Sequence, residues 1–148
     1  SDNVYDKYLK NSPFPVIRGE NQALLSVSDA LILASGTVAL EACLYQTPMI
    51  IAYRGPWLFY LIYLMVIRIN HVSLPNIIAN KDIVPEILQG DVKVDKISHE
   101  IENLLYNQEY RAQNIKELGE VKSLLSDKNS SKEAASVIAE FLGINKSL

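Results

Sequence analysis

Three small residues, Ser35-Gly36-Thr37, stand between an apolar run and a run of good helix formers. If the first run is a strand and the second a helix, the N–H groups and positive dipole end of that helix face the space above the turn. Gly36 would let a ligand approach the backbone, and the hydroxyls of Ser35 and Thr37 could donate to phosphate oxygens. The tripeptide therefore predicts an anion site; the alternative is that Ser35 or Thr37 only caps the helix.

Glu41 lies four residues after Thr37, so on a helix the two would share a face about one turn apart. A carboxylate there could accept hydrogen bonds from both hydroxyls of a ribose while a phosphate stays at the helix N-terminus. The spacing favours a nucleoside diphosphate as ligand, and the alternative is a solvated surface glutamate. A strand followed by Ser-Gly-Thr is also compatible with Rossmann-like proteins of many chemistries.

Short apolar runs that alternate with helical segments would position these residues. Residues 30–34 and 49–53 are continuously apolar, which is typical of parallel strands buried on both faces. Between them residues 37–46 favour a helix, which Thr47-Pro48 ends. The predicted fold is therefore α/β, with a Rossmann-like parallel sheet whose ligands lie beyond the C-terminal ends of the strands.

The flanking segments extend this pattern on both sides. Upstream, residues 15–18 predict an extended strand and residues 20–27 a helix. Downstream, Pro56 suits the first turn of an apolar helix, and residues 72–76 break it. The last third predicts helices throughout, at residues 84–89, 94–106, 109–125 and 132–142.

Composition excludes several classes of function. The net charge is −3 and the basic residues are scattered, so no stripe would neutralise nucleic-acid phosphates. Cys43 is the only cysteine, which excludes an internal disulfide and a cysteine-based zinc site and fits a small buried side chain. His71 and His99 lack metal-ligand spacing, so no metal is expected.

Residues 1–11 lack the apolar core of a signal peptide, which favours a cytoplasmic location.

An uncharged run covers residues 57–67, beginning at Trp57 and ending at Ile67. As a helix it would reach about half of a bilayer's hydrocarbon thickness, so it is too short to span a membrane. A helix that is apolar on every face is buried in its own domain or covered by a partner or lipid. The run therefore leaves peripheral contact with a membrane open.

A set of short motifs follows in a fixed order along the chain: Ser28-Asp29-Ala30, Ala34-Ser35-Gly36-Thr37, Leu40-Glu41, Pro48-Met49, Tyr53-Arg54, Val72-Ser73-Leu74-Pro75-Asn76, Val84-Pro85-Glu86 and Leu88-Gln89. This ordered set resembles lipid-A-disaccharide synthases. Other GT-B transferases and UDP-N-acetylglucosamine epimerases share the glycine-containing turn and the glutamate one helical turn on, but not the Ser-Leu-Pro-Asn element.

The resemblance implies the C-terminal domain of a GT-B fold, where the nucleotide-sugar donor is held. Residues 1–92 would form the Rossmann-like UDP-sugar-binding domain, and residues 93–148 helices that pack on it or extend from it. The acceptor-binding N-terminal domain and its catalytic base would be missing, so the chain alone is expected to be inactive. No cofactor is implied, and a homodimer is left open.

Carried over residue by residue, the resemblance implies that Ser35, Gly36 and Thr37 hold the diphosphate and Glu41 the ribose. Asn76, which follows Pro75, would present its amide toward the cleft as a catalytic candidate, with an Asx turn as the alternative. Arg54 and Glu86 are further donor-binding candidates. For Arg54, a salt bridge to a helix is the alternative.

The implied activity is inverting transfer of 2,3-diacylglucosamine from its UDP derivative to 2,3-diacylglucosamine 1-phosphate, which forms the lipid A disaccharide and releases UDP. Its acylated substrates favour a cytoplasmic protein with peripheral contact at the inner membrane. Another GT-B UDP-sugar transferase or an epimerase would satisfy the same turn. A non-catalytic module that binds a nucleotide or a partner is the alternative of a different class.

Overall fold

The computed structural model describes residues 9, 12–56, 71–126 and 130–142. Three parallel strands form its sheet in the order β1 (Leu31–Leu33), β2 (Met49–Tyr53) and β3 (Glu86–Leu88). Leu33 lies opposite Ile51, and Ile51 lies opposite Glu86, so the C-terminal ends of the strands meet at one edge. The helices are α2 (Asn21–Val27), α3 (Val38–Tyr45), α5 (Leu74–Ala79), α6 (Val94–Tyr106), α7 (Gln108–Ser126) and α8 (Ser130–Phe141), with a 3₁₀ turn at Gln89–Asp91.

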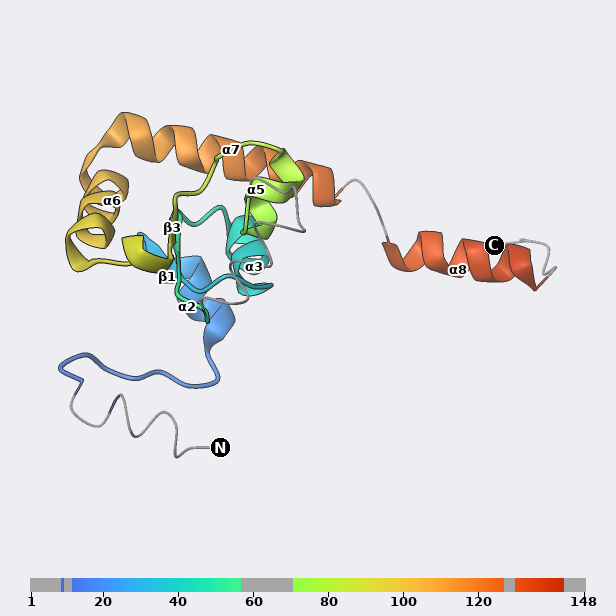
Figure 1. Cartoon of the computed structure of the whole chain (residues 1–148). Coiled ribbons are helices and arrows are strands. Elements are labelled where there is room, and N and C mark those ends of the chain that lie inside the picture. The colour runs from blue at the N-terminus through green and yellow to red at the C-terminus, as the bar shows by residue number, and fades with distance from the viewer. Residues whose placement is uncertain (1–8, 10–11, 57–70, 127–129, 143–148) are drawn as a thin grey trace.

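Helices cover both faces of the sheet, as Figure 1 shows. On one face α2, α3, α5 and α7 pack against one another, and α6 packs against β2 on the other. Because side chains alternate along a strand, Met49 and Ile51 enter the first core while Ile50 enters the second. All three are completely buried, which confirms the buried character predicted for this strand.

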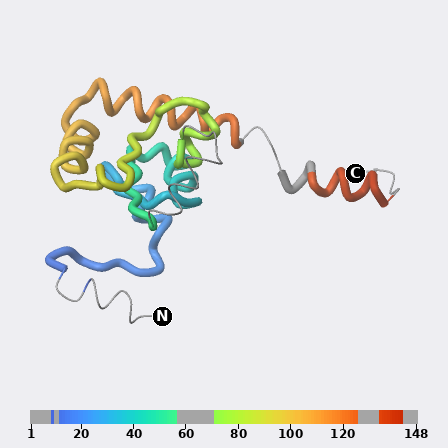
Figure 2. The backbone as a smooth tube through the Cα atoms, in the orientation of Figure 1, coloured from blue at the N-terminus to red at the C-terminus, as the bar shows by residue number. Residues whose placement is uncertain are grey.

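The predicted α/β class is confirmed, as are the helix between the first two strands and the helices predicted at residues 94–106, 109–125 and 132–142. The tube in Figure 2 follows the chain from the sheet into α6 and α7 and then to α8, which lies apart from the rest. Leu104 of α6 and Leu118 of α7 are fully buried against the two faces of the sheet. None of the described helices is long and apolar enough to cross a membrane, and the apolar run at residues 57–67 lies outside the described residues.

Two predictions about upstream strands are wrong. Residues 15–18 are exposed and form no strand, because an extended backbone becomes a strand only when a neighbour accepts and donates its hydrogen bonds. In β1 the side chain of Ile32 is 56% exposed, so this strand is not buried on both faces. Within the described residues β1 is an edge strand, and no helix covers Ile32.

One prediction between β2 and α6 is also wrong. Residues 84–89, predicted to be helical, contain β3, because the chain reaches the free side of β2 and the Ile51 N–H donates to the Pro85 carbonyl at 2.9 Å. Residues 72–76 are predicted to break a helix over the residues before them, which lie outside the described part of the chain; Val72 and Ser73 are not helical, and α5 begins at Leu74. Pro75 lies in the first turn of α5, where its missing N–H costs no helical hydrogen bond.

Cys43 is a buried packing residue, as expected. Its side chain is fully buried on α3, and the Sγ lies 3.4 Å from the Leu118 carbonyl of α7. Burial raises the pKa of its thiol to about 11, although Lys122 acts in the opposite direction. This thiol therefore stays protonated at neutral pH and ties α3 to α7.

Candidate functional site

The turn at Ser35-Gly36-Thr37 connects the C-terminal end of β1 to α3, at the sheet edge where ligands of such folds lie. A Cβ atom built on Gly36 would meet no heavy atom within 4 Å, so the space beside this backbone is open. Thr37 is exposed and its side chain makes no capping hydrogen bond to α3. The N-terminus of α3 is therefore neither filled nor capped by the side chain of Thr37.

Ser35 makes a hydrogen bond within the protein. Its hydroxyl donates to the Val72 carbonyl at 3.2 Å, which joins the end of β1 to the loop before α5. The oxygen of Ser35 keeps its acceptor capacity, but its proton is directed to Val72 rather than to the open space. Ser35 therefore positions the turn as well as lining it.

Glu41 lies in the first turn of α3 and is exposed, as is Thr37 one turn earlier. The opposite side of α3 is buried, with Ala39, Ala42 and Cys43 completely inaccessible. The helix thus presents Thr37 and Glu41 to solvent in the order that the spacing predicted. This arrangement leaves room for an anion at the turn and a hydroxyl-bearing group beside Glu41.

Glu86, which is partly buried, and Asn76, which is fully buried, form a polar network next to the turn. The Glu86 carboxylate accepts hydrogen bonds of 2.8 Å each from the Val72 and Ser73 N–H groups and from the Asn76 side-chain amide. Since Ser35 binds the Val72 carbonyl, the network reaches from β3 through this loop to the end of β1. Three predicted site residues are therefore connected through Val72.

Asn76 does not face the cleft as expected. Its side chain is fully buried, and its Oδ1 accepts hydrogen bonds from the Ile83 and Val84 N–H groups at 3.0 and 2.9 Å. Its Nδ2 donates to the Val84 carbonyl at 2.8 Å besides Glu86. Because Asn76 lies within α5, it does not form an Asx turn either. Its contacts define a positioning residue, and a role close to the donor stays a prediction.

Arg54 follows the last residue of β2 and is exposed at the same sheet edge as the turn. Among the described residues no ion pair with Arg54 is formed, so the alternative of a salt bridge to a helix finds no support there. Its guanidinium is therefore available to an anion at this edge. The part of the chain that the structure describes offers no group of three His, Cys, Asp or Glu side chains for a metal.

The sequence did not identify the contribution of Val72 and Ser73. Their backbone N–H groups face the Glu86 carboxylate, and the Ser73 side chain is fully buried. The residue types at these two positions do not reveal the direction of their backbone N–H groups. The only signal in the sequence was the carboxylate of Glu86, which needs hydrogen-bond donors.

The chain is similar to proteins of one family along most of its length. A family model described as lipid-A-disaccharide synthetase matches residues 3–141. Three relatives named lipid-A-disaccharide synthase come from Anaeromyxobacter sp. (strain K), Psychromonas ingrahamii and Pseudomonas fluorescens. Over 112, 99 and 135 residues they are 38, 39 and 33% identical to this chain.

These alignments cover 76, 67 and 90% of the chain, but only 29, 26 and 35% of the respective relatives. The chain thus spans about a third or less of the relatives it matches. The motifs at Ser35-Gly36-Thr37 and at residues 72–76 fall inside the matched range. We conclude that the chain belongs to the lipid-A-disaccharide synthetase family.

Proposed function

We propose that this chain is the donor-binding part of a glycosyltransferase that makes the lipid A disaccharide. The donor is the UDP derivative of 2,3-diacylglucosamine, the acceptor is 2,3-diacylglucosamine 1-phosphate, and UDP is released. The observation that carries the proposal is the open turn at Ser35-Gly36-Thr37, followed by an exposed Glu41 one helical turn on. Membership of the family supports the reaction.

The diphosphate would lie at the N-terminus of α3. The first N–H groups of a helix have no partner within the helix, and the dipole favours negative charge at this end. Gly36 leaves the backbone accessible, and Thr37 adds a hydroxyl donor. Arg54, at the end of the neighbouring strand, would supply the positive charge that the turn lacks.

The ribose would lie against α3 with its two hydroxyls donating to the Glu41 carboxylate. Glu41 sits in the first turn of α3, so a nucleotide whose phosphates occupy the turn would bring its sugar to this carboxylate. Asn76 and Glu86 would act indirectly. By fixing the Val72 carbonyl, they hold the group that orients the Ser35 hydroxyl.

In the transfer step the acceptor hydroxyl oxygen bonds to the anomeric carbon while the bond from that carbon to the diphosphate breaks. The hydroxyl proton goes to a base, and negative charge grows on the departing UDP. Preorganised N–H donors at the α3 N-terminus would stabilise this charge, and one such donor is worth about 3–4 kcal/mol of barrier lowering in comparable sites. Because the chain spans about a third or less of its relatives, the proposal assigns it donor binding only.

The experiment compares UDP with inorganic pyrophosphate by calorimetry, using wild type and Glu41→Ala. We expect Glu41→Ala to weaken UDP binding roughly tenfold or more, because two hydroxyl-to-carboxylate hydrogen bonds are lost. Pyrophosphate binding should change less than twofold. Glu120→Ala, an exposed glutamate on α7, is the matched control and should leave both ligands unaffected.

Equal losses for UDP and pyrophosphate would contradict the ribose role of Glu41. If the folded wild-type chain bound neither ligand, the alternative of a module for interaction with another protein would gain support. Far-UV circular dichroism of each variant establishes that the fold is intact.

A further inference from the structure

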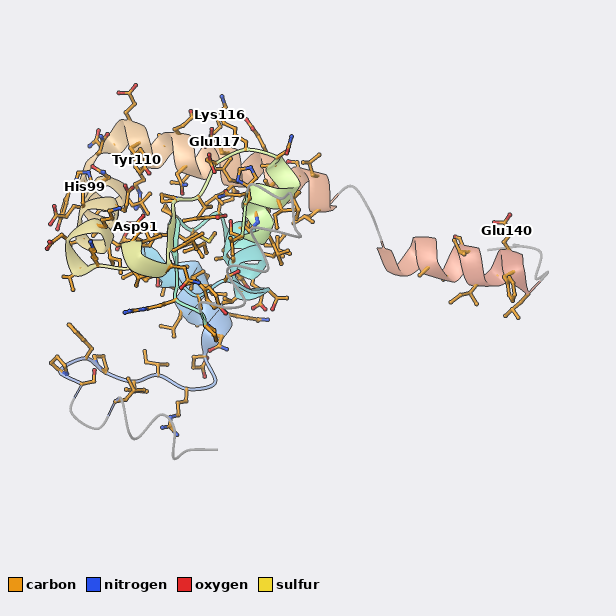
Figure 3. All side chains as sticks on the ribbon, viewed as in Figure 1. Asp91, His99, Tyr110, Lys116, Glu117 and Glu140 are labelled. Atoms are coloured by element: carbon orange, nitrogen blue, oxygen red, sulfur yellow. The ribbon has the colours of Figure 1, made fainter. Side chains whose placement is uncertain are left out.

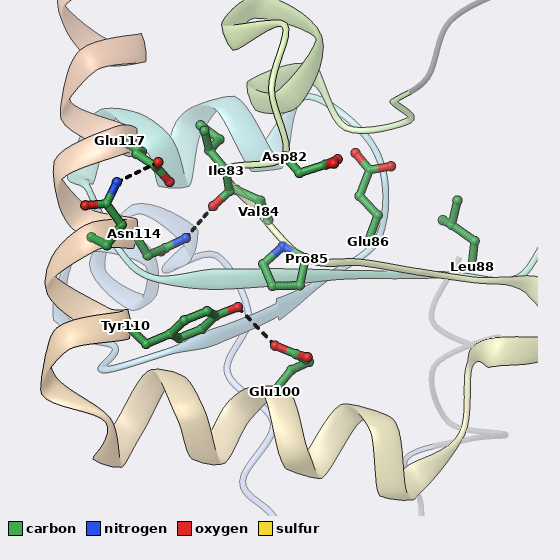
Figure 4. Close-up of a pocket in the computed structure, with 11 residues that line it drawn as sticks. Asp82, Ile83, Val84, Pro85, Glu86, Leu88, Glu100, Tyr110, Asn114 and Glu117 are labelled. Carbon is green, nitrogen blue, oxygen red and sulfur yellow. Dashed lines mark hydrogen bonds between the residues drawn. The ribbon is translucent and has the colours of Figure 1, made fainter.

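A second concave site lies along the outer edge of β3, between α6 and α7. It has a volume of about 500 Å³ and is lined by Pro85 just before β3, Glu86 and Leu88 of β3, Glu100 from α6, and Tyr110 and Asn114 from α7 (Figure 4). β1 and β3 are at opposite edges of the sheet, but Glu86 links this cavity to the turn at residues 35–37, because the Val72 N–H donates to its carboxylate and the Val72 carbonyl accepts the Ser35 hydroxyl. None of the proposed diphosphate or ribose ligands lines it.

The lining carries negative charge without a basic side chain of its own. Four carboxylates line the cavity, at Asp82, Glu86, Glu100 and Glu117, and no Lys, Arg or His does. Three of them already have partners, since Glu86 accepts N–H groups, Glu117 binds Lys81, and Asp82 lies 3.0 Å from His71 Nδ1. Around Glu117, burial opposes ionisation, but the hydrogen bonds from Lys81 and Gln113 prevail and lower its pKa.

Glu100 has a single neutral hydrogen-bond donor, whereas Glu86 has three. It is half-buried on α6, and within the described residues no basic side chain pairs with it. Its Oε2 accepts only the Tyr110 hydroxyl, at 3.0 Å. Burial and the charge of Glu100 raise the pKa of Tyr110 to about 12, so the phenol remains a donor at neutral pH. This half-buried carboxylate therefore has a single neutral donor and no counter-ion among the described residues.

Asn114 adds an independent sign that a donor belongs here. Asn114 is 4% exposed and reaches from α7 toward the loop before β3, where Nδ2 donates to the Ile83 carbonyl at 2.6 Å (Figure 4). This bond fixes the orientation of the amide. Oδ1, on the other side, has no hydrogen-bond partner among the described residues. A buried acceptor without a donor is rare in native proteins, and a bound ligand is one way to satisfy it.

The edge of β3 supplies further acceptors. In a parallel ladder successive residues direct their backbone groups alternately to the two sides of the strand. The Pro85 carbonyl binds Ile51 of β2, so the backbone groups of Glu86 and Leu88 face away from β2, toward the cavity that both residues line. Figure 3 shows Tyr110 and Glu117 along α7.

We propose that this cavity binds the protonated amine of an organic cation, with Glu100 as its counter-ion and Asn114 Oδ1 as a second acceptor. The backbone carbonyls at the β3 edge accept the remaining N–H groups. An organic cation fits better than a metal ion, because the described residues do not bring three metal-binding side chains together. The amine is that of a free alkylamine or of a lysine side chain whose peptide lies along β3.

Nuclear magnetic resonance titration of the 148-residue chain tests the proposal with three small probes: n-butylammonium chloride, 1-butanol, and potassium chloride at matched ionic strength. We expect only n-butylammonium to give saturable shifts of the Asn114 side-chain amide and of Tyr110. A blocked tripeptide, N-acetyl-Ala-Lys-Ala-amide, distinguishes the sources. Binding at least tenfold tighter than n-butylammonium assigns a peptide, and similar affinity assigns a free amine.

Two variants on α6 provide the decisive comparison. Glu100→Gln removes the counter-ion and should weaken n-butylammonium binding at least fivefold. Glu102→Gln removes the same charge from an exposed position that does not line the cavity, and should change the affinity less than twofold. The proposal is overturned if 1-butanol or potassium produces the same shifts, or if the two variants behave alike.

Discussion

Replacement of Asn76 by alanine should strongly destabilise the fold. The Ile83 and Val84 N–H groups both donate to Asn76 Oδ1, and the side chain is completely buried. Leaving a buried donor unsatisfied costs about 1–3 kcal/mol, so two of them give roughly 2–6 kcal/mol. Part of this cost is relieved if water enters beside the exposed end of α5, and we expect about 3–4 kcal/mol.

That loss is a large fraction of the 5–15 kcal/mol by which ordinary domains are stable. The assay is urea-induced unfolding followed by far-UV circular dichroism. Asn103→Ala on α6 is the matched control, because it gains the same helix propensity but loses only a contact of 3.3 Å with His99 at the surface. Its effect should stay below about 0.5 kcal/mol.

A loss of less than about 1 kcal/mol for Asn76→Ala, or one equal to that of Asn103→Ala, would refute the structural role of the network. If the expected loss is found, a fall in the activity of an Asn76 variant in a longer enzyme cannot be assigned to chemistry before its fold has been measured.

Two further predictions concern the core and the contacts of α7. Because burial raises the pKa of the Cys43 thiol from 9.0 to about 11, this group stabilises the fold below pH 9 and loses that effect as the pH rises toward 11. The free energy of unfolding of Cys43→Ala should therefore rise relative to that of wild type as the pH increases from 8 to about 10.5, measured by urea unfolding. A difference between the two proteins that does not change with pH would contradict this. Arg111→Met removes hydrogen bonds of 2.6 and 3.1 Å to the Asp29 and Leu104 carbonyls, and should lower the free energy of unfolding by about 1–2 kcal/mol. An unchanged urea midpoint would show that these bonds contribute nothing.

The parts of the fold that depend on local pattern could be predicted from the sequence. The continuous apolar run at Met49–Tyr53 specified β2, and the helical spacing of Ile97, Ile101 and Leu104 specified α6. In both segments local preference and burial agree, so pattern alone was sufficient. The connection at Ser35-Gly36-Thr37 followed from the two elements that it joins.

The parts that depend on distant neighbours could not be predicted in this way. Glu86–Leu88 is too short for a pattern and becomes β3 only because β2 offers a free edge. Residues 15–18 have strand character but join no strand in the described part of the chain. Of the candidate site residues, Thr37, Glu41 and Arg54 are exposed at one edge of the sheet, but Asn76 is turned inward by backbone groups whose direction no residue type reveals.

A nitrogen-15 labelled chain titrated with UDP tests most directly whether the nucleotide binds at the start of α3. The largest shifts should fall on the backbone amides of residues 35–38 and on Glu41, with saturation at one equivalent site. Shifts concentrated on Glu100, Tyr110 and Asn114 at the β3 edge, or no shift in a folded sample, would contradict the proposed diphosphate site.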